Sequence, residues 1–403
     1  MNILVINAGS SSLKFSIFEM VGHKVLAEGI IERIGQEGST CKYKKYGQEE
    51  IKESVKGSDY KNALAETVRF LLHKKHGVIR SKNEIQAIGH RVVHGGEFIS
   101  KPVLIDQDIK RIIKNCFELA PLHNPPNFMG IVACEEMFPG IKQVGVFDTA
   151  FHQSIPKHAF LYGLPIELYE NEGIRRYGFH GTSHRFIAGK CAELLSESKN
   201  GVNIISVHLG NGCSVTAVKN GKSIDTSMGF TPLEGLVMGT RCGDIDPAIV
   251  FHLMEHKGYS RDEIDRLLNK KSGLLGLAEI GTSDMRDILN AVKDGNKKAE
   301  AALDVFCYRI KKYIGAYTAV IGEVGALVFT AGIGENVPVV REKVCSGLEP
   351  LGYELDVSKN EKNEMVVSTD KSVSKIMVIP THEDLKIAQD TLYVLQESGF
   401  ISR

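Results

Sequence analysis

Residues 3 to 18 read Ile-Leu-Val-Ile-Asn-Ala-Gly-Ser-Ser-Ser-Leu-Lys-Phe-Ser-Ile-Phe, and this stretch decides the fold. Its first four residues form a continuous apolar run, which is typical of a strand covered on both faces. Small residues interrupt the run at positions 7–12, and from Leu13 to Ile17 apolar and polar residues alternate with the period of a half-buried strand. Another strand is predicted around residues 24–31. The chain therefore opens with strand, turn, strand and strand.

The same pattern begins again near residue 203. Residues 203–209 are mostly apolar, Gly210-Asn-Gly-Cys213 predicts a turn, and Asn220-Gly221 is a strong hairpin signal between two further strands. Helices alternating with short strands follow in both halves of the chain. We therefore predict an α/β protein made of two duplicated domains around a central cleft. The first would comprise residues 1–150 and 383–403, including a last helix at 383–396, and the second residues 151–382.

Other segments carry local predictions. The polar, lysine-rich residues 35–61 look like a solvated excursion from the first domain, and helical spacing predicts a helix over 63–76. Ser260-Arg-Asp-Glu263 is a capping box that predicts the start of a helix.

Composition excludes several classes of protein. The chain has 403 residues, of which 43% are hydrophobic and 24% are charged, and 49 basic residues balance 49 acidic ones. No overall field would attract nucleic acid or an anionic membrane. No stretch has the roughly 18 apolar residues of a membrane span, and the N-terminus does not resemble a signal peptide. The eight scattered cysteines contain no Cys-x-x-Cys pair, so free thiols are expected. We expect a cytoplasmic protein that binds neither nucleic acid nor membranes.

Four turns of small residues follow predicted strands, at positions 7–12, 210–213, 281–284 and 331–336. Such turns direct backbone N–H groups toward one point, which suits phosphate oxygens. None matches the P-loop pattern, and Gly332-Ile-Gly-Glu-Asn336 lacks the third glycine of a dinucleotide fingerprint. Asn336 is also predicted to cap the helix that follows it. A single turn of this kind is more often structural, but four at strand ends together indicate a phosphate-binding site, since open α/β sheets bind ligands at the carboxyl ends of their strands.

Charged residues next to these turns are candidates for catalysis. Arg91 ends a predicted strand before a glycine pair, and Arg241 lies among glycines in Gly239-Thr-Arg-Cys-Gly243. Arginine can hold a planar anion with two hydrogen bonds. Asp148 ends an apolar strand, where burial would otherwise be costly. His180 is flanked by glycines, but a single histidine is more often structural than functional.

Several motifs resemble a known family, the acetate kinases. Asn7-Ala-Gly-Ser-Ser-Ser-Leu-Lys-Phe15 and Gly178-Phe-His-Gly-Thr-Ser-His184 resemble its paired signatures, and the resemblance continues along the whole chain. The family belongs with the sugar kinases, actin and the heat-shock ATPases. The resemblance therefore implies duplicated ribonuclease-H-like domains that close over ATP, a homodimer, and Mg²⁺, with Mn²⁺ as a substitute.

The resemblance also implies roles for individual residues. Those near the metal would be Asn7 and Glu383. The catalytic set would be Arg91, Asp148, His180 and Arg241. The acid would contact Arg91 and an apolar pocket of Val93, Leu122, Phe179 and Pro232. The nucleotide, ATP or ADP, would be held by Ser10, Ser12, Lys14, His208, Leu209, Gly210, Asn211, Gly212, Asp284, Met285, Arg286, Gly332, Ile333, Gly334, Glu335 and Asn336. His382 and Asp384 differ from the residues that the family usually has at these positions. Glu383 is retained, so the difference affects the groups around the metal ligands and not Glu383 itself.

The chemistry of the acceptor limits what Asp148 can do. A carboxylic acid titrates near pH ~4–5, so the acceptor is ionised at neutral pH and has no proton to remove. We therefore interpret Asp148 as a residue that holds Mg²⁺ through water or orients an arginine, rather than as a general base.

Two alternatives to an acetate kinase can be tested. A propionate kinase of the same family differs by one methylene in its substrate, which changes discrimination by only ~1–3 kcal/mol; Val93 favours acetate over longer acids. A nucleotide-gated binding module of the actin or chaperone type would hydrolyse ATP slowly and transfer nothing. The two arginines and His180 argue against such a module.

Overall fold

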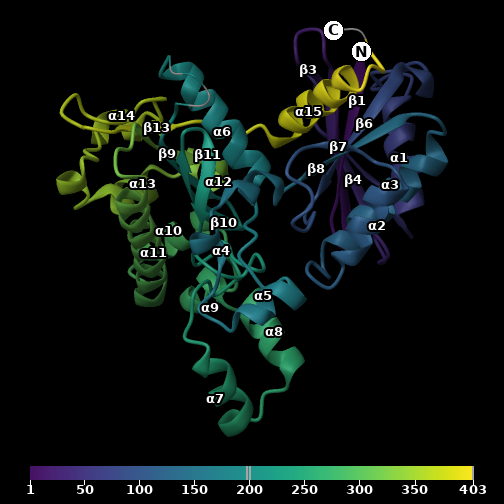
Figure 1. Ribbon diagram of the computed structural model, residues 1–403. Helices are drawn as coiled ribbons and strands as arrows, with labels where there is room; N and C mark the ends of the chain where they lie inside the picture. Colours follow the sequence, from purple (N-terminus) through teal and green to yellow (C-terminus); the bar gives the residue numbers. More distant parts are fainter. Residues whose placement is uncertain (197, 199–200, 402–403) are drawn as a thin grey trace. The chain divides into compact units, whose positions relative to one another are not determined.

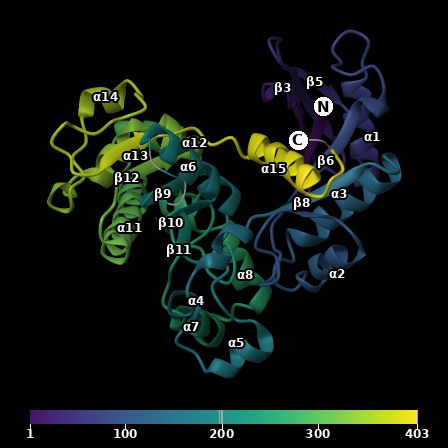
Figure 2. The same ribbon diagram turned by 45° about the horizontal axis from the view of Figure 1, so that its top comes forward.

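The structure is a computed structural model that describes residues 1–196, 198 and 201–401. By its contacts the chain divides into two compact units: Met1–Gln153 with His382–Arg403, called unit 1, and Ser154–Thr381, called unit 2. Figure 1 and Figure 2 show a sheet with helices in each unit. None of the helices within the described residues is long and apolar enough to span a membrane.

Unit 1 is built on an eight-stranded mixed sheet. Across the sheet the strands are β5 (Ile51–Ser54), β4 (Thr40–Lys45), β3 (Lys24–Glu32), β2 (Ser12–Glu19), β1 (Asn2–Ala8), β6 (Ile85–Val92), β8 (Lys142–Phe147) and β7 (Val103–Leu104). Its helices are α1 (Tyr60–Leu71), α2 (Gln107–Asn115), α3 (Asn124–Met137) and α15 (Glu383–Glu397), with short 3-10 turns at Lys82–Glu84 and Ala150–Ser154.

Strand β1 shows why helices pack on both faces of this sheet. Its side chains alternate, so Leu4 and Ile6 join one core cluster with residues of α1 and α3. Ile3 and Val5 join the opposite cluster, which contains Ile387 and other residues of α15. The apolar run at the start of the chain is thus a strand buried on both faces, as predicted. The helix α15 crosses from the far end of the sequence to cover the second face (Figure 1).

Unit 2 is built on a five-stranded sheet with the order β11 (Lys222–Thr226), β10 (Cys213–Lys219), β9 (Ile204–Leu209), β12 (Ala326–Thr330) and β13 (Lys375–Val378). Its helices are α4 (Lys157–Phe160), α5 (Ile166–Glu172), α6 (Gly181–Leu194), α7 (Ala248–Lys257), α8 (Arg261–Lys270), α9 (Gly273–Ala278), α10 (Met285–Lys293), α11 (Lys297–Ile321), α12 (Ala331–Asn336), α13 (Pro338–Cys345) and α14 (Val357–Glu361), with a 3-10 turn at Glu349–Leu351.

The two sheets share one topology. In unit 1, β1 is antiparallel to β2, β2 is antiparallel to β3, and β1, β6 and β8 run parallel to one another. In unit 2, β9 is antiparallel to β10, β10 is antiparallel to β11, and β9, β12 and β13 run parallel. The same five-strand order with the same directions in both units confirms the predicted duplication.

The structure confirms some of the local predictions from the sequence and corrects others. The capping box at Ser260 is present at the start of α8, and all eight cysteines are free thiols. The prediction of a solvated excursion at 35–61 was wrong, because β4 and β5 extend the sheet there. Cys41 and Tyr43 of β4 are fully buried, whereas Lys42 between them is half-buried and Lys44 after them is exposed. The helix predicted over 63–76 begins earlier and ends earlier, as α1.

Candidate active site

Three of the predicted site residues lie at one edge of the sheet in unit 1. Asn7 is near the end of β1, Arg91 near the end of β6, and Asp148 directly follows β8. These strands are parallel, and the backbone N–H of Asp148 donates to the carbonyl of Val92 at 2.9 Å. Carboxyl ends of parallel strands are where open α/β sheets bind ligands. The topology therefore brings these side chains to one edge.

Arg91 and Asp148 form a close ion pair at this edge. Nη2 of Arg91 lies 2.7 Å from Oδ2 of Asp148, and Nε donates to both carboxylate oxygens at 3.1 Å. Asp148 is buried, and burial raises the pKa of its carboxyl against the opposing effect of Arg91. Burial alone would lower the pKa of Arg91, but Asp148 and Glu383 raise it. Arg91 therefore stays charged and is held in one orientation.

A second ion pair joins β2 to the start of α15. Nζ of Lys14 lies 3.0 Å from Oδ2 of Asp384, and Oγ of Ser16 donates to the same oxygen at 2.8 Å. Lys14 is opposite Asn7 in the β1–β2 register. Asp384 was noted in the sequence only as a departure from the family, and its contacts with Lys14 and Ser16 were not predicted. No local pattern indicates them, because 368 positions separate Ser16 from Asp384.

Oxygen ligands are available for a divalent metal in unit 1. Asn7 offers an amide oxygen, and the carboxylates of Glu383 and Asp148 both influence the pKa of Arg91. Mg²⁺ prefers hard oxygen ligands and is commonly held by one or two carboxylates together with substrate phosphates. Within the described residues, no group of three or more His, Cys, Asp or Glu side chains could hold a metal ion. Asn7 and Glu383 would supply oxygen ligands of the kind that Mg²⁺ takes together with substrate phosphates.

Asn127 of α3 supports two strand ends at the same edge and was not predicted. Its Oδ1 accepts from the N–H of Val93 at 3.0 Å, and its Nδ2 donates to the carbonyl of Ala8 at 2.6 Å. Val93 is buried, whereas the side chain of Leu122 is 48% exposed. Asn127 thus fixes the backbone from which Val93 extends.

The turn at 9–12 is closed by its own backbone. The N–H of Gly9 donates to the carbonyl of Ser12 at 2.8 Å, which makes the connection between β1 and β2 tight. Ser10 is exposed at the turn and Ser12 is the first residue of β2. Both serines therefore lie next to Asn7 and Lys14.

His180 is the central residue of the site in unit 2. It immediately precedes α6 and has a left-handed backbone with φ 58°, which is uncommon for a residue other than glycine. Its Nδ1 lies 2.9 Å from Oγ of Ser214, which in turn lies 2.8 Å from Nε2 of His184. Nδ1 of His184 is 2.9 Å from Oγ of Ser206. A chain of hydrogen bonds thus holds the His180 ring.

Arg241 lies close to His180. A Cβ atom placed on Gly212 would be 3.4 Å from Nε2 of His180 and 3.5 Å from Nη1 of Arg241, so both side chains border the 210–213 turn. Nη1 of Arg241 donates to the carbonyl of Pro232 at 3.2 Å. Burial lowers the pKa of Arg241. In the part of the chain that the structure describes, no carboxylate forms an ion pair with Arg241, so its charge is available for an anion.

The predicted nucleotide residues of unit 2 lie at the ends of β9 and β12. His208 is paired with Thr330 in the register, and its ring stacks on His180 with centroids 4.2 Å apart. Leu209 ends β9, and Gly210, Asn211 and Gly212 form the turn into β10. The N–H of Gly239 donates to the carbonyl of Asn211 at 2.9 Å, which fixes the turn against the segment that carries Arg241.

The segment after β12 differs from its prediction. Gly332, Ile333, Gly334 and Glu335 belong to the helix α12 rather than to a turn. Asn336 does not cap the next helix, because Val337 holds that position and Nδ2 of Asn336 donates to the carbonyl of Gly332 at 3.0 Å. Glycine is common in turns, so the glycines at 332 and 334 predicted a turn, whereas the segment forms a short helix.

Thr381 and Arg341, neither of which was predicted, hold α12 in place. The carboxylate of Glu335 accepts from the N–H groups of Ala331 and Thr381 at 2.8 Å and 3.0 Å. The fully buried Arg341 donates to the carbonyls of Gly334 and Glu335 at 2.8 Å and 3.0 Å. Arg341 was not predicted, and a lone arginine in a helix gives no signal in the sequence.

Asp284, Met285 and Arg286 form the start of α10. Asp284 caps the helix by accepting from the N–H of Arg286, and the Arg286 guanidinium folds back onto it with Nη2 2.6 Å from Oδ2. Hydrogen bonds from Arg286 lower the pKa of Asp284 to about 2. Met285 is buried. No hydrogen bond or ion pair among the described residues joins these three to the His180 and Arg241 group.

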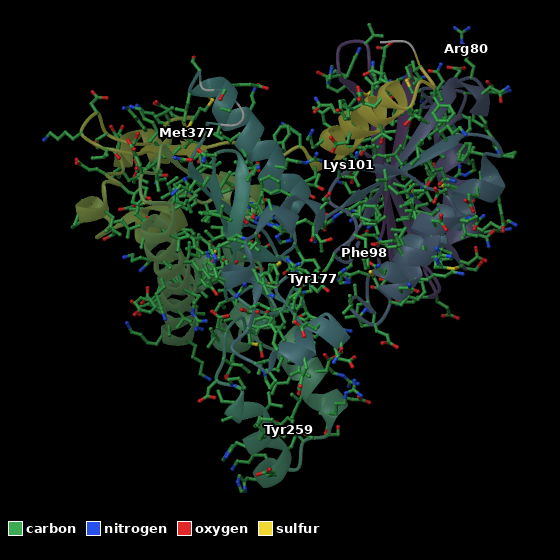
Figure 3. The ribbon with its side chains drawn as sticks, viewed as in Figure 1. Arg80, Phe98, Lys101, Tyr177, Tyr259 and Met377 are labelled. Atoms are coloured by element: carbon green, nitrogen blue, oxygen red, sulfur yellow. The ribbon has the colours of Figure 1, made fainter. Side chains whose placement is uncertain are left out.

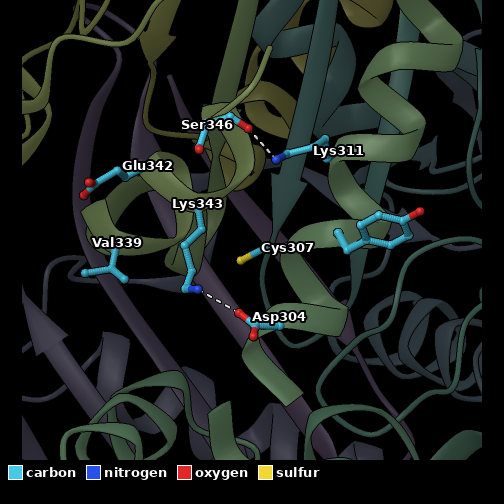
Figure 4. A pocket seen from close by; sticks show the side chains of 8 residues that line it. Asp304, Cys307, Lys311, Val339, Glu342, Lys343 and Ser346 are labelled. Carbon is cyan, nitrogen blue, oxygen red and sulfur yellow. Dashed lines mark hydrogen bonds and ion pairs between the residues drawn. The ribbon is translucent and has the colours of Figure 1, made fainter. Parts of the chain in front are cut away.

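A surface pocket of about 530 Å³ lies between α11 and α13, away from the predicted residues (Figure 4). Its two lysines are already engaged: Lys343 with Asp304 at 2.7 Å, and Lys311 with the carbonyl of Ser346. Nothing in its lining resembles the groups expected for phosphoryl transfer. The candidate residues lie at the strand ends within each unit and not at this pocket.

Comparison with known proteins shows the family of the chain. The family model described as the acetokinase family matches residues 2–389. The chain belongs to the acetokinase family. An acetate kinase of Alkaliphilus metalliredigens is 52% identical over 393 residues, which cover 97% of this chain and 99% of that protein.

Solved structures of acetokinases show the same fold. The crystal structure of Porphyromonas gingivalis acetate kinase has a TM-score of 0.94 at 45% identity, covering 98% of this chain and 99% of that one. A propionate kinase from Francisella tularensis has a TM-score of 0.92 at 43% identity, with the same coverage. The fold class predicted from the sequence, duplicated domains of the actin and sugar-kinase type, is confirmed for this acetokinase. The chain is a phosphotransferase of the class that acts on a carboxyl group.

Proposed function

We propose that the chain is an acetate kinase, which transfers a phosphoryl group between ATP and acetate to give ADP and acetyl phosphate. The observation that carries the proposal is the half-buried Arg241 guanidinium, which borders the same turn as His180 and has no carboxylate partner among the described residues. Phosphoryl transfer spreads charge over three equatorial oxygens, and fixed cationic or hydrogen-bonding groups stabilise that charge. Arg241 and His180 are groups of this kind.

The reaction needs no general base. An oxygen of the ionised acetate forms a bond to the γ-phosphorus, the bond from that phosphorus to the β,γ-bridging oxygen breaks, and ADP leaves with the electron pair. Arg91 would bind the acetate carboxylate, oriented by Asp148. Mg²⁺, or Mn²⁺ in its place, would neutralise phosphate charge when bound near Asn7 and Glu383. His208, Asn211 and the 332–336 segment would hold the nucleotide.

Trapping of the acyl phosphate tests this function. Enzyme, ATP, Mg²⁺ and acetate are incubated with hydroxylamine, which converts acetyl phosphate to acetohydroxamate. We expect hydroxamate in proportion to enzyme and none without acetate. ATP hydrolysis without hydroxamate would instead support a nucleotide-gated binding module and would contradict the proposal.

A propionate kinase is the second candidate, because the Francisella tularensis structure of that name is 43% identical. The side chain that would contact the methyl end of the acid is Val93, which is buried at the strand edge. Values of kcat/KM for acetate, propionate and butyrate decide between the two. We expect acetate to have the highest value.

We further propose that the enzyme is a cytoplasmic homodimer, with α7 in the interface. Ile249, Phe251 and Met254 on this helix are 44%, 60% and 43% exposed, and no residue of α7 is buried. Apolar residues that are exposed together are typical of an interaction site. Phe251→Asp should shift the sedimentation coefficient toward that of a monomer. Val373→Asp, which changes another exposed apolar residue of unit 2, should not.

A further inference from the structure

Arg176 in unit 2 joins two segments of the chain and has no part in the mechanism above. Its Nη1 donates to three successive carbonyls, those of Thr226, Ser227 and Met228, at 2.9, 3.2 and 3.2 Å. Its Nη2 donates to Oε1 of Glu234 at 2.6 Å. One guanidinium thus holds the strand end at 226 and the loop that follows it.

Tyr162 completes this arrangement. Its hydroxyl bonds to Oε2 of Glu234, and it accepts from the N–H of Phe230 at 2.8 Å. We call Tyr162, Arg176 and Glu234 the clamp. The side chains of Arg176 and Glu234 are only 16% and 30% exposed, so their hydrogen bonds are largely shielded from water.

Gly229 lies inside the clamp and connects it to a third piece of backbone. A Cβ atom on Gly229 would be 1.6 Å from Oε2 of Glu234 and 2.2 Å from the Tyr162 hydroxyl, so any larger residue would displace these side chains. The carbonyl of Gly229 accepts from the N–H groups of Tyr177 and Gly178 at 3.0 Å and 3.2 Å. Tyr177, labelled in Figure 3, is buried at the start of this third segment.

The clamped segments carry most of the proposed acid site of unit 2. Phe179 and His180 follow Gly178 directly, and Pro232 lies between Gly229 and Glu234. The carbonyl of Pro232 in turn accepts from Arg241. The hydrogen bonds of the clamp and of Gly229 therefore join the two segments that carry Phe179 and Pro232.

Stability alone is a weak explanation for these three residues. A buried ion pair often contributes little net stability compared with apolar residues of similar volume, because both charges lose their hydration. Such a pair does fix geometry when its hydrogen bonds are all made. Here one arginine satisfies three carbonyls and one carboxylate, which favours a positioning role.

We propose that Tyr162, Arg176 and Glu234 are positioning residues that hold Phe179 and Pro232 at a fixed spacing and thereby exclude acids longer than the natural substrate. This inference rests on the proposed function, since it assigns the two apolar residues to the acid site. No member of the clamp touches the substrate. Each acts through the backbone of the segments that it holds.

The test compares three variants with the wild type. Tyr162→Phe keeps the ring and removes the hydroxyl, Glu234→Gln keeps the shape and removes the charge, and Gly229→Ala forces the clamp apart. We expect the ratio of kcat/KM for acetate to that for butyrate to fall about tenfold, the scale of one methylene in an apolar pocket. The KM for ATP should change less than about twofold. Tyr169→Phe is the matched control, because Tyr169 is a half-buried tyrosine of the same unit.

Measurements of Tm and of amide hydrogen exchange distinguish a positioning role of the clamp from a purely structural one. If kcat falls together with Tm while the acetate to butyrate ratio stays constant, the clamp is only structural and the proposal is overturned. Exchange of the Tyr177 and Gly178 amides should accelerate in Tyr162→Phe and not in Tyr169→Phe. If the wild type forms no hydroxamate with any acid, the proposed function fails, and equal exchange in both variants would overturn the positioning role independently.

Discussion

Asp148 accepts hydrogen bonds from both Nε and Nη2 of Arg91, the shorter at 2.7 Å, at the carboxyl ends of two neighbouring parallel strands. This arrangement occupies both oxygens of the carboxylate with a guanidinium. Asp148 is therefore placed to orient Arg91, and this is one of the two roles that the chemistry of an ionised acceptor leaves open.

Asp148→Asn should lower kcat by roughly 100-fold and raise the Mg²⁺ concentration needed for half-maximal rate. The reason is that Glu383 is the next carboxylate to influence Arg91. Once Asp148 is neutral, Arg91 would turn toward Glu383 and compete with the metal for it. Rates measured over a series of Mg²⁺ concentrations check this expectation.

Asp108→Asn is the control for that substitution. Asp108 pairs with Arg111 on the surface, where both side chains are largely exposed, so its loss should leave the Mg²⁺ dependence as it is. A lower kcat with unchanged Mg²⁺ dependence in Asp148→Asn would mean that Asp148 acts only through the hydrogen bonds of Arg91.

Arg241→Ala should reduce kcat by about 10²–10³-fold, the usual cost of removing one preorganised donor from a transition state. Arg241→Lys should recover little of this loss, because an ammonium cannot reproduce the two parallel hydrogen bonds of a guanidinium. Arg91→Ala should show a loss of similar size. Near-normal rates in both alanine variants would remove these arginines from the site. Lys190→Ala, a change in an exposed pair with Glu193, serves as the control.

The fold was largely predictable because its decisive signals are local and repeated. The apolar run at Ile3 and the turn after it recur at Ile204, and both became the first strand of the same five-strand topology. The segment at 35–61 was misread for a physical reason. Its lysines dominate the composition, while the residues that face the core are few: Cys41 and Tyr43 are fully buried, and Ile51, Val55 and Tyr60 are partly buried against the same cluster.

The site was predictable only in part, because its supporting contacts join distant positions. Lys14 was expected on the phosphate path, but its partner Asp384 is on the last helix. Ser214 and Asn127 gave no signal, since serine and asparagine occur in many strands and helices. Their roles become visible only when the fold brings His180, Ala8 and Val93 to them.

Ser214→Ala should lower kcat roughly tenfold, less than the ~10²–10³-fold cost of removing a donor that touches the reacting groups. Oγ of Ser214 lies 2.9 Å from Nδ1 of His180 and 2.8 Å from Nε2 of His184. We expect this hydroxyl to favour one tautomer of His180, because the hydrogen bond that one ring nitrogen makes influences which nitrogen carries the proton. Nitrogen chemical shifts of His180 should report a mixture of tautomers in the variant.

Ser206→Ala is the matched control for Ser214→Ala. Ser206 is equally buried and bonds to the other nitrogen of His184, one step farther from His180. We expect a smaller effect on kcat and an unchanged His180 tautomer. Equal effects of the two substitutions would indicate that the serines only support the packing of β9 and β10.

ATP binding is expected to be lost as the pH rises, and Asp384→Asn should lower the pH at which this loss occurs. Burial alone would lower the pKa of Lys14, but Asp384, with smaller contributions from Glu383 and Glu28, more than offsets it, so the pKa is raised in the folded protein. The stabilising contribution of Lys14 is therefore complete below its ordinary pKa, about 10.4, and is lost as the pH rises through the higher folded value. Without the Asp384 charge only Glu383 and Glu28 oppose the effect of burial, so the pKa of Lys14 falls and the loss moves to lower pH.

The KM for ATP measured from pH 7 to pH 10 decides this prediction. In the wild type it should stay constant, and in Asp384→Asn it should rise toward the alkaline end as Lys14 loses its proton. Asp304→Asn is the control, because Asp304 also raises the pKa of a lysine, Lys343, but at a surface pocket away from the predicted site. A constant KM in both variants would show that Lys14 does not bind the nucleotide phosphates. A rise in both would point to a general effect of alkaline pH on the fold.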